Sequence, residues 1–122
     1  MKENGKKIVI AEDDRFISEM YATKLSAEGF EVEVVNNGKE AVEIVEKIKP
    51  DVVLLDIMMP KLDGIEVLKR IRGNKDLKDV SVIVLTNANE KDHVFKSMGV
   101  SGYLIKSSFT PDEVVEKIKE KI

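Results

Sequence analysis

Cysteine is absent from this 122-residue chain, which excludes thiol catalysis, Cys-ligated zinc, iron–sulfur clusters and a disulfide framework. Histidine is limited to His93, and one histidine cannot form a metal site alone. No apolar run approaches the length of a membrane span, and residues 1–7 lack the apolar core of a signal peptide. An excess of one charge is also missing, because 20 basic and 23 acidic residues leave a formal net charge of −3. The sequence therefore predicts no direct nucleic-acid contact, no membrane association and a cytoplasmic location.

The composition that remains is that of one globular domain. Hydrophobic residues make up 43% of the chain and charged residues 35%, whereas disordered chains are poorer in apolar residues. A chain of this length forms a single domain of ordinary size, and it buries enough surface to fold without a metal or disulfide. We therefore expect one domain over residues 1–122.

Short apolar, β-branched runs predict the strands. Four runs are continuous and are typical of strands that are covered on both faces of a parallel sheet: residues 8–11, 52–55, 80–85 and 102–105. Residues 31–34 alternate polar and apolar side chains instead, which predicts a less buried strand at the edge of the sheet.

Between these runs, apolar residues at helical spacing predict five helices. Four contain residues 16–25, 41–48, 65–71 and 114–122, and a shorter one is expected from a cap at Asn89 to Gly99. Asn37 and Thr110 are expected N-caps, since each is followed three residues later by glutamate. Strict alternation predicts an α/β fold with a doubly wound, five-stranded parallel sheet. The expected strand order is 2-1-3-4-5, with five helices in a three-layer, flavodoxin-like sandwich.

Acidic residues follow the first and third predicted strands. Glu12, Asp13 and Asp14 come after the first strand, and Asp56 ends the third. The predicted order makes these strands neighbours, roughly 5 Å apart, so at least three carboxylates converge at one edge of the sheet. Like charges at that range oppose joint ionisation, and a ligand set of oxygens alone favours a hard divalent cation, Mg²⁺ above Zn²⁺.

A hydroxyl and an ammonium group end the other two core strands. Thr86 ends the fourth strand and Lys106 follows the fifth. Each group alone has an ordinary structural explanation, as a turn hydroxyl or a surface cation. Four strands that deliver such groups to the same edge favour a site that holds a phosphoryl group, with a carboxylate as the nucleophile.

In these segments the chain closely resembles the receiver domain of two-component response regulators, including the stand-alone chemotaxis type. The resemblance covers almost the whole chain, from Ile8 to the final helix. It rests on residues 8–14 (IVIAEDD), residues 54–60 (LLDIMMP) with Asp63-Gly64 after them, residues 84–86 (VLT) and residues 102–106 (GYLIK).

The resemblance implies a phosphoryl acceptor and a metal ion. Asp56 would accept the phosphoryl group from a phosphohistidine on a histidine kinase or phosphotransfer domain. Mg²⁺ would be held by Asp13, Asp56 and the backbone carbonyl of Met58, with Glu12 acting through water. The protein would then not be a multiple-turnover enzyme, although it would catalyse its own phosphorylation and dephosphorylation.

The resemblance also implies a switch. Lys106 would contact the phosphoryl oxygens, Thr86 would move to donate a hydrogen bond to one of them, and Tyr103 would change rotamer when Thr86 moves. The surface around Tyr103 would then bind a downstream effector protein or the protein's own output domain. The expected oligomeric state is a monomer or a weak, phosphorylation-dependent dimer.

Three features depart from the family pattern. One is Asn87, which stands where the family usually has a smaller residue. Ser107 stands where the family commonly has a proline joined by a cis bond; a cis bond before another residue costs about 2.5–4 kcal/mol, so we predict a trans Lys106–Ser107 bond. Met58 and Ala88 carry no polar group to align an attacking water. We therefore predict slow self-dephosphorylation.

Two other functions are weighed against this interpretation. The first is a hydrolase with Asp56 as nucleophile, which is disfavoured because the position two residues later, where a general acid would stand, is Met58. The second is a binding or dimerisation module that has lost phosphotransfer, for which Ser107 is the only support. The sequence leaves open the cognate kinase, the output partner, and whether the receiver stands alone or belongs to a longer regulator.

Overall fold

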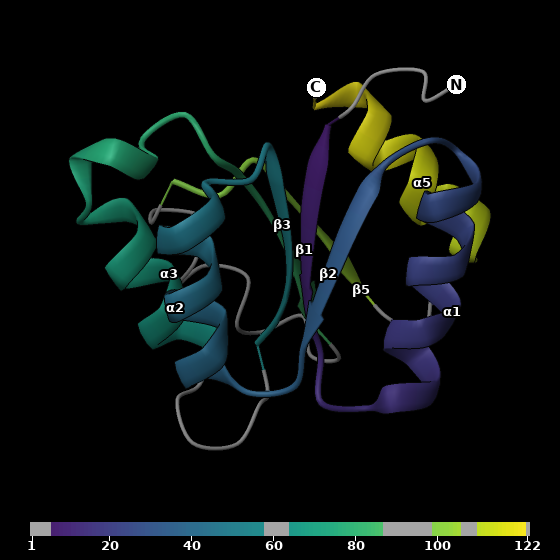
Figure 1. The fold of residues 1–122 in the computed structure, drawn as a ribbon, viewed down its shortest axis with the longest axis horizontal. Helices are drawn as coiled ribbons and strands as arrows, with labels where there is room; N and C mark the ends of the chain where they lie inside the picture. The colour runs from purple at the N-terminus through teal and green to yellow at the C-terminus, as the bar shows by residue number, and fades with distance from the viewer. Residues whose placement is uncertain (1–5, 58–63, 87–98, 106–109, 122) are drawn as a thin grey trace.

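A computed structural model describes residues 6–57, 64–86, 99–105 and 110–121, and in it the strands form one parallel sheet (Figure 1). The sheet order is β2-β1-β3-β4-β5, as predicted, and every neighbouring pair is parallel. The strands are β1 (Lys7–Ala11), β2 (Glu31–Val35), β3 (Val52–Asp56), β4 (Ser81–Thr86) and β5 (Gly102–Ile105).

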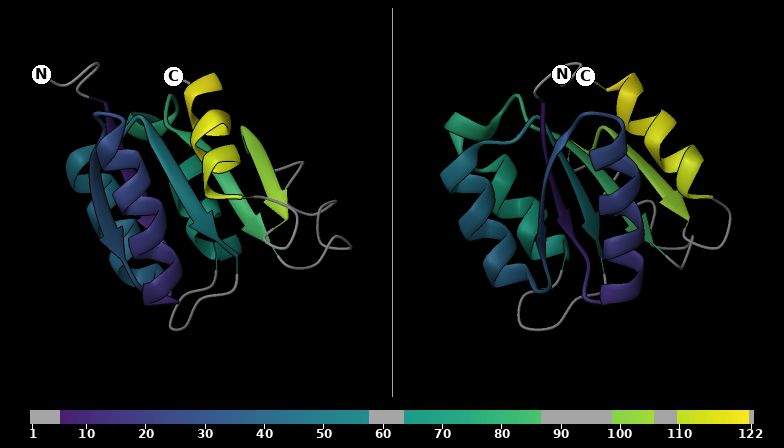
Figure 2. Two further views of the ribbon diagram at one scale, coloured as in Figure 1. Left: turned by 90° about the vertical axis from the view of Figure 1, so that its right-hand side faces the viewer. Right: turned by 45° about the vertical axis from the view of Figure 1, so that its right-hand side comes forward.

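Helices cover both faces of the sheet, which confirms the three-layer sandwich. α1 (Arg15–Ala27) and α5 (Pro111–Glu120) lie on one face, and α2 (Gly38–Ile48) and α3 (Gly64–Arg72) lie on the other (Figures 1 and 2). The described residues contain four α-helices and not the five expected, because all but the last residue of the predicted helix from Asn89 to Gly99 lies outside them. None of the helices in the described ranges is long and apolar enough to cross a bilayer.

One short element was not predicted. The 3₁₀ helix η1 (Lys75–Leu77) connects α3 to β4, and the side-chain oxygen of Asn74 caps it by accepting the N–H of Asp76 at 2.9 Å. Three residues are too few to show helical periodicity, so the hydrophobic pattern carries no signal for this turn.

The two faces of the central strands pack into two separate apolar clusters. Ile8 and Ile10 of β1 belong to the cluster beneath α1 and α5, whereas Val9 and Ala11 belong to the cluster beneath α2 and α3. Because side chains alternate across a strand and both faces are covered, all four residues are fully buried. The continuous apolar runs of β1, β3 and β4 are thus buried on both faces, as predicted. The expectation was wrong for residues 102–105: β5 lies at the other edge of the sheet, and only Leu104 of its four residues is buried. β2 keeps an alternating pattern at the edge of the sheet, also as predicted.

The helix boundaries follow local signals that the sequence carries. Asn37 caps α2 by accepting the N–H of Glu40 at 2.9 Å. Thr110 and Glu113 form a reciprocal capping box at the start of α5. α1 ends before Gly29, whose φ of 95° lies in the left-handed region that glycine adopts without strain.

Arg72, the last residue of α3, ties three chain segments together at the amino-terminal edge of the sheet. Its guanidinium donates to the backbone carbonyls of Gly99 at 2.8 Å, Val80 at 2.7 Å and Leu77 at 3.4 Å. Partial burial lowers the pKa of this guanidinium, but an arginine starts so far above neutrality that it stays charged. Glycine suits position 99, since its φ of 80° lies in the left-handed region and a Cβ there would press against the Arg72 side chain at 3.2 Å.

Replacing Arg72 should therefore destabilise the fold. We expect Arg72→Met to lower the free energy of unfolding by about 2–4 kcal/mol, because partly buried carbonyls lose charged donors. Arg70→Met is the matched control: Arg70 forms an exposed pair with Glu66 at 3.5 Å, and its loss should cost less than about 0.5 kcal/mol. Urea denaturation of both variants measures the difference, and equal losses would contradict the role given to Arg72.

Candidate functional site

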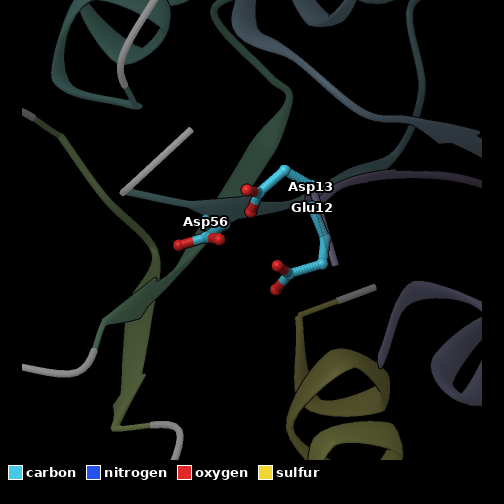
Figure 3. A group of neighbouring side chains, drawn as sticks. All are labelled: Glu12, Asp13 and Asp56. Carbon is cyan, nitrogen blue, oxygen red and sulfur yellow. The ribbon is translucent and has the colours of Figure 1, made fainter. Parts of the chain in front are cut away.

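The carboxylates of Glu12, Asp13 and Asp56 gather at the carboxyl-terminal edge of the sheet, as the strand order predicts. One oxygen from each side chain lies within 4.8 Å of the others (Figure 3). Glu12 and Asp13 directly follow β1, and Asp56 ends the neighbouring β3. Glu12 is fully buried and Asp56 is 2% exposed, whereas Asp13 is exposed.

Glu12 is held by backbone groups on two sides. Its N–H donates to the carbonyl of Val35 at 3.1 Å, which extends the pairing of β1 with β2 by one residue. Its carboxylate Oε2 accepts the backbone N–H of Asp14 at 3.1 Å. Asp14 in turn caps α1, because its Oδ1 accepts the N–H of Ile17 at 3.2 Å. The third acid of the triplet thus has a structural position at the start of the helix.

Asp56 is fixed by a close approach between β3 and the start of α3. Ile57, the next residue, donates its N–H to the carbonyl of Leu85 at 3.0 Å and accepts the N–H of Gly64 at 2.9 Å. A Cβ on Gly64 would lie 2.5 Å from the Cα of Ile57 and 2.7 Å from the carbonyl oxygen of Asp56. Only glycine permits this contact, which explains the glycine of the Asp63-Gly64 pair.

Thr86 ends β4 at the same edge of the sheet and is 2% exposed. The register pairs Thr86 with Ile105 and Val84 with Tyr103. Val84 belongs to the apolar cluster beneath α2 and α3, and the half-buried Tyr103 packs against that same cluster. Because residues two apart in a strand share a face, Thr86 and Tyr103 lie on the same face of adjacent strands.

Two predicted site residues lie outside the described residues. They are Met58, whose carbonyl is an expected metal ligand, and Lys106, the expected contact to phosphoryl oxygens. The Lys106–Ser107 bond and Ala88 lie there as well. Their roles stay predictions from the sequence.

The grouping of three carboxylates has an electrostatic cost. Buried charges are costly unless they are paired, and carboxylates this close repel one another. A divalent cation among them would remove both costs, and an all-oxygen donor set suits Mg²⁺. Within the described residues, this is the one group of acidic, histidine or cysteine side chains arranged to hold a metal ion. The residues present therefore fit a magnesium ion.

A surface concavity away from the acidic edge carries no comparable arrangement. It has a volume of about 960 Å³ and lies at the opposite, amino-terminal ends of β1 and β2, beside the end of α1. Its lining includes Glu28, Glu31 and Glu33, but these carboxylates do not form a metal-holding group in the structure.

Neutralising Asp13 should have opposite effects with and without metal. In EDTA and low salt, Asp13→Asn should raise the free energy of unfolding by about 0.5–1 kcal/mol, because it removes one of three mutually repelling charges. With excess Mg²⁺ the wild type should gain stability by binding the ion, and the variant should gain less. Thermal unfolding in both buffers tests this, and a variant that is destabilised in EDTA would contradict the repulsion.

The chain matches the family described as the response regulator receiver domain over residues 8–119. It is 34% identical over 117 residues to the phosphate regulon transcriptional regulatory protein PhoB of Pseudomonas aeruginosa, which covers 94% of this chain and 51% of that protein. The chain thus spans about half the length of curated relatives that it matches.

Solved structures agree with this match over nearly their whole length. The chemotaxis response regulator CheY4 of Vibrio cholerae superposes with a TM-score of 0.90 at 28% identity, covering 98% of this chain and 100% of that chain. The receiver domain of sensor histidine kinase PA1611 from Pseudomonas aeruginosa, solved with a magnesium ion in its active-site cleft, gives a TM-score of 0.86 at 26% identity, covering 96% and 97% of the two chains. Fold, acidic edge and family match agree: the chain belongs to the family of response regulator receiver domains of two-component systems.

Proposed function

We propose that residues 1–122 form one receiver domain in which Asp56 is the phosphoryl acceptor of a phosphorelay. The observation that carries this proposal is the position of the Asp56 carboxylate. Asp56 ends the buried strand β3 and is nearly inaccessible to solvent. An oxygen of its carboxylate lies within 4.8 Å of an oxygen of Glu12 and an oxygen of Asp13. A buried acid beside two others is costly for stability, so its placement indicates chemistry.

Asp13, Asp56 and the backbone carbonyl of Met58 would hold Mg²⁺ directly, and Glu12 would act through water. The bound ion would neutralise phosphoryl oxygens and so lower the repulsion between the incoming group and the acids. The all-oxygen donor set supports this assignment, as does the magnesium ion in the receiver domain of PA1611.

In the transfer step, a carboxylate oxygen of Asp56 attacks the phosphorus of a phosphohistidine. The new oxygen–phosphorus bond forms as the phosphorus–nitrogen bond breaks, and the imidazole leaves with that electron pair and takes up a proton. The product is an aspartyl phosphate. The low exposure of Asp56 limits access of water to this bond.

Thr86 and Tyr103 would read the phosphorylated state. Phosphorylation adds about one negative charge and new acceptor oxygens at Asp56. The Thr86 hydroxyl would donate to one of these oxygens, and Lys106 would contact another. Since Tyr103 lies on the same face of the adjacent strand, a shift of Thr86 opens space into which the ring can turn. The surface around Tyr103 would change with it.

The proposed partners are a histidine kinase or phosphotransfer domain before the reaction and an effector or output domain after it. Phe16 is 79% exposed on the first turn of α1, close in sequence to Asp13, and offers an apolar contact to a docking kinase. PhoB is named a transcriptional regulatory protein, so the expectation of no nucleic-acid contact is confined to residues 1–122. We propose a cytoplasmic location.

Incubation with acetyl phosphate and Mg²⁺ should add one phosphoryl group to the protein, as seen by intact mass. Asp56→Ala should abolish the adduct because it removes the nucleophile. Asp76→Asn is the control: Asp76 is exposed in η1, which lies before β4 at the opposite edge of the sheet, and its replacement should leave labelling unchanged.

Each other outcome contradicts the proposal. Sustained turnover of diverse phosphate esters would indicate a hydrolase, and no adduct in the wild type would indicate a module without phosphotransfer. An adduct that persists in Asp56→Ala would place the acceptor elsewhere.

The lifetime of the adduct should depend on Met58. The methionine side chain cannot align an attacking water, so Met58→Asn should shorten the half-life of the aspartyl phosphate. The decay of the intact-mass adduct after removal of acetyl phosphate measures both half-lives. A longer half-life in the variant would refute the prediction.

A further inference from the structure

Asn36 lies directly after β2, at the same edge of the sheet as the three acids. Its side-chain amide Nδ2 donates to the backbone carbonyl of Glu12 at 3.2 Å. The neighbouring backbone bond, from the Glu12 N–H to the Val35 carbonyl, is 3.1 Å long. Val35 therefore holds the N–H of Glu12 and Asn36 holds its carbonyl. Glu12 lies one residue beyond the last paired residue of β1.

The neighbouring asparagine, Asn37, has a different role. It is the N-cap of α2, and its side-chain oxygen accepts the N–H of Glu40. β2 ends at Val35 and the chain begins α2 after Asn37, so the backbone ladder between β1 and β2 stops at the bond from Glu12 to Val35. The Asn36 amide continues this hydrogen bonding by one further bond, at the residue that precedes Asp13.

We propose that Asn36 is a positioning residue for the site: it holds the Glu12–Asp13 peptide in the place from which the Asp13 carboxylate meets Asp56. The inference rests on the proposed function, since it concerns Mg²⁺ at the acidic edge. Asn36 touches neither the metal nor the phosphoryl group and acts through the loop that carries two of the acids.

The electrostatics explain why such a tether matters. Glu12, Asp13 and Asp56 repel one another, so an unrestrained loop after β1 would move its exposed member, Asp13, away from β3. Cation binding would then have to draw the loop back, at a cost in affinity. A tether that acts before the ion arrives removes that cost.

The test is the Mg²⁺ affinity of the purified chain, measured by isothermal titration calorimetry. Asn36→Leu, of similar size but without a donor, should weaken Mg²⁺ binding about tenfold, as losses of outer-shell partners do. Asn36→Ser keeps a hydroxyl donor and should weaken it less. Asn74→Ala is the control: the Asn74 side chain also bonds a backbone group, by accepting the N–H of Asp76, but it does so at the opposite edge of the sheet, so its loss should leave the affinity unchanged.

A second measurement separates positioning from general stability. Amide hydrogen exchange of Asp13 and Asp14 in EDTA should be faster in Asn36→Leu than in the wild type and unchanged in Asn74→Ala. Wild-type Mg²⁺ affinity in Asn36→Leu, or an equal loss in Asn74→Ala, would overturn the inference while the proposed function stands. Absence of Mg²⁺ binding by the wild type would overturn the proposed function itself.

Discussion

Repulsion among three carboxylates is the constraint on which the carboxyl-terminal edge of this sheet depends. Glu12 and Asp56 are buried and Asp13 is exposed, yet one oxygen of each lies within 4.8 Å of the others. A fold selected for stability alone would separate or neutralise these charges. The structure instead fixes them, through the backbone bonds of Glu12 and through the glycine that brings α3 against Asp56. We propose that this arrangement prepares the edge for a divalent cation and a phosphoryl group.

The amino-terminal and carboxyl-terminal ends of the strands differ in the contacts that they carry. At the amino-terminal edge, Arg72 joins the end of α3 to the carbonyls of Leu77, Val80 and Gly99, and all of these contacts serve the fold. At the carboxyl-terminal edge, Thr86 and the acids form the proposed phosphoryl site, and Asn36 donates to the carbonyl of Glu12 in the loop that carries Asp13. This division follows from parallel topology, which brings every strand end that precedes a helix to one edge.

The sequence predicts the sheet well because the cause of each pattern is local. The continuous apolar runs of β1, β3 and β4 became strands buried on both faces, and the alternation at residues 31–34 became an edge strand. Thr110 became the helix cap that its spacing to Glu113 indicates. The run at residues 102–105 misled, because β5 lies at the other edge and is mostly half-buried. The convergence of Glu12, Asp13 and Asp56 followed from strand order alone. Arg72 and Asn36 were missed, because their partners are backbone carbonyls of other elements and loops, and no periodicity or motif marks such a contact.

The most direct test of the account is an amide NMR titration of the wild-type chain with Mg²⁺. The account predicts saturable shifts, with one ion per chain, at the amides of Glu12, Asp13 and Asp56. The acidic residues of the opposite concavity, Glu28, Glu31 and Glu33, supply the internal reference and should not move. Saturable shifts confined to that concavity, or no saturable shift at residues 12, 13 and 56, would contradict the central claim that the carboxyl-terminal edge is a cation-assisted phosphoryl site.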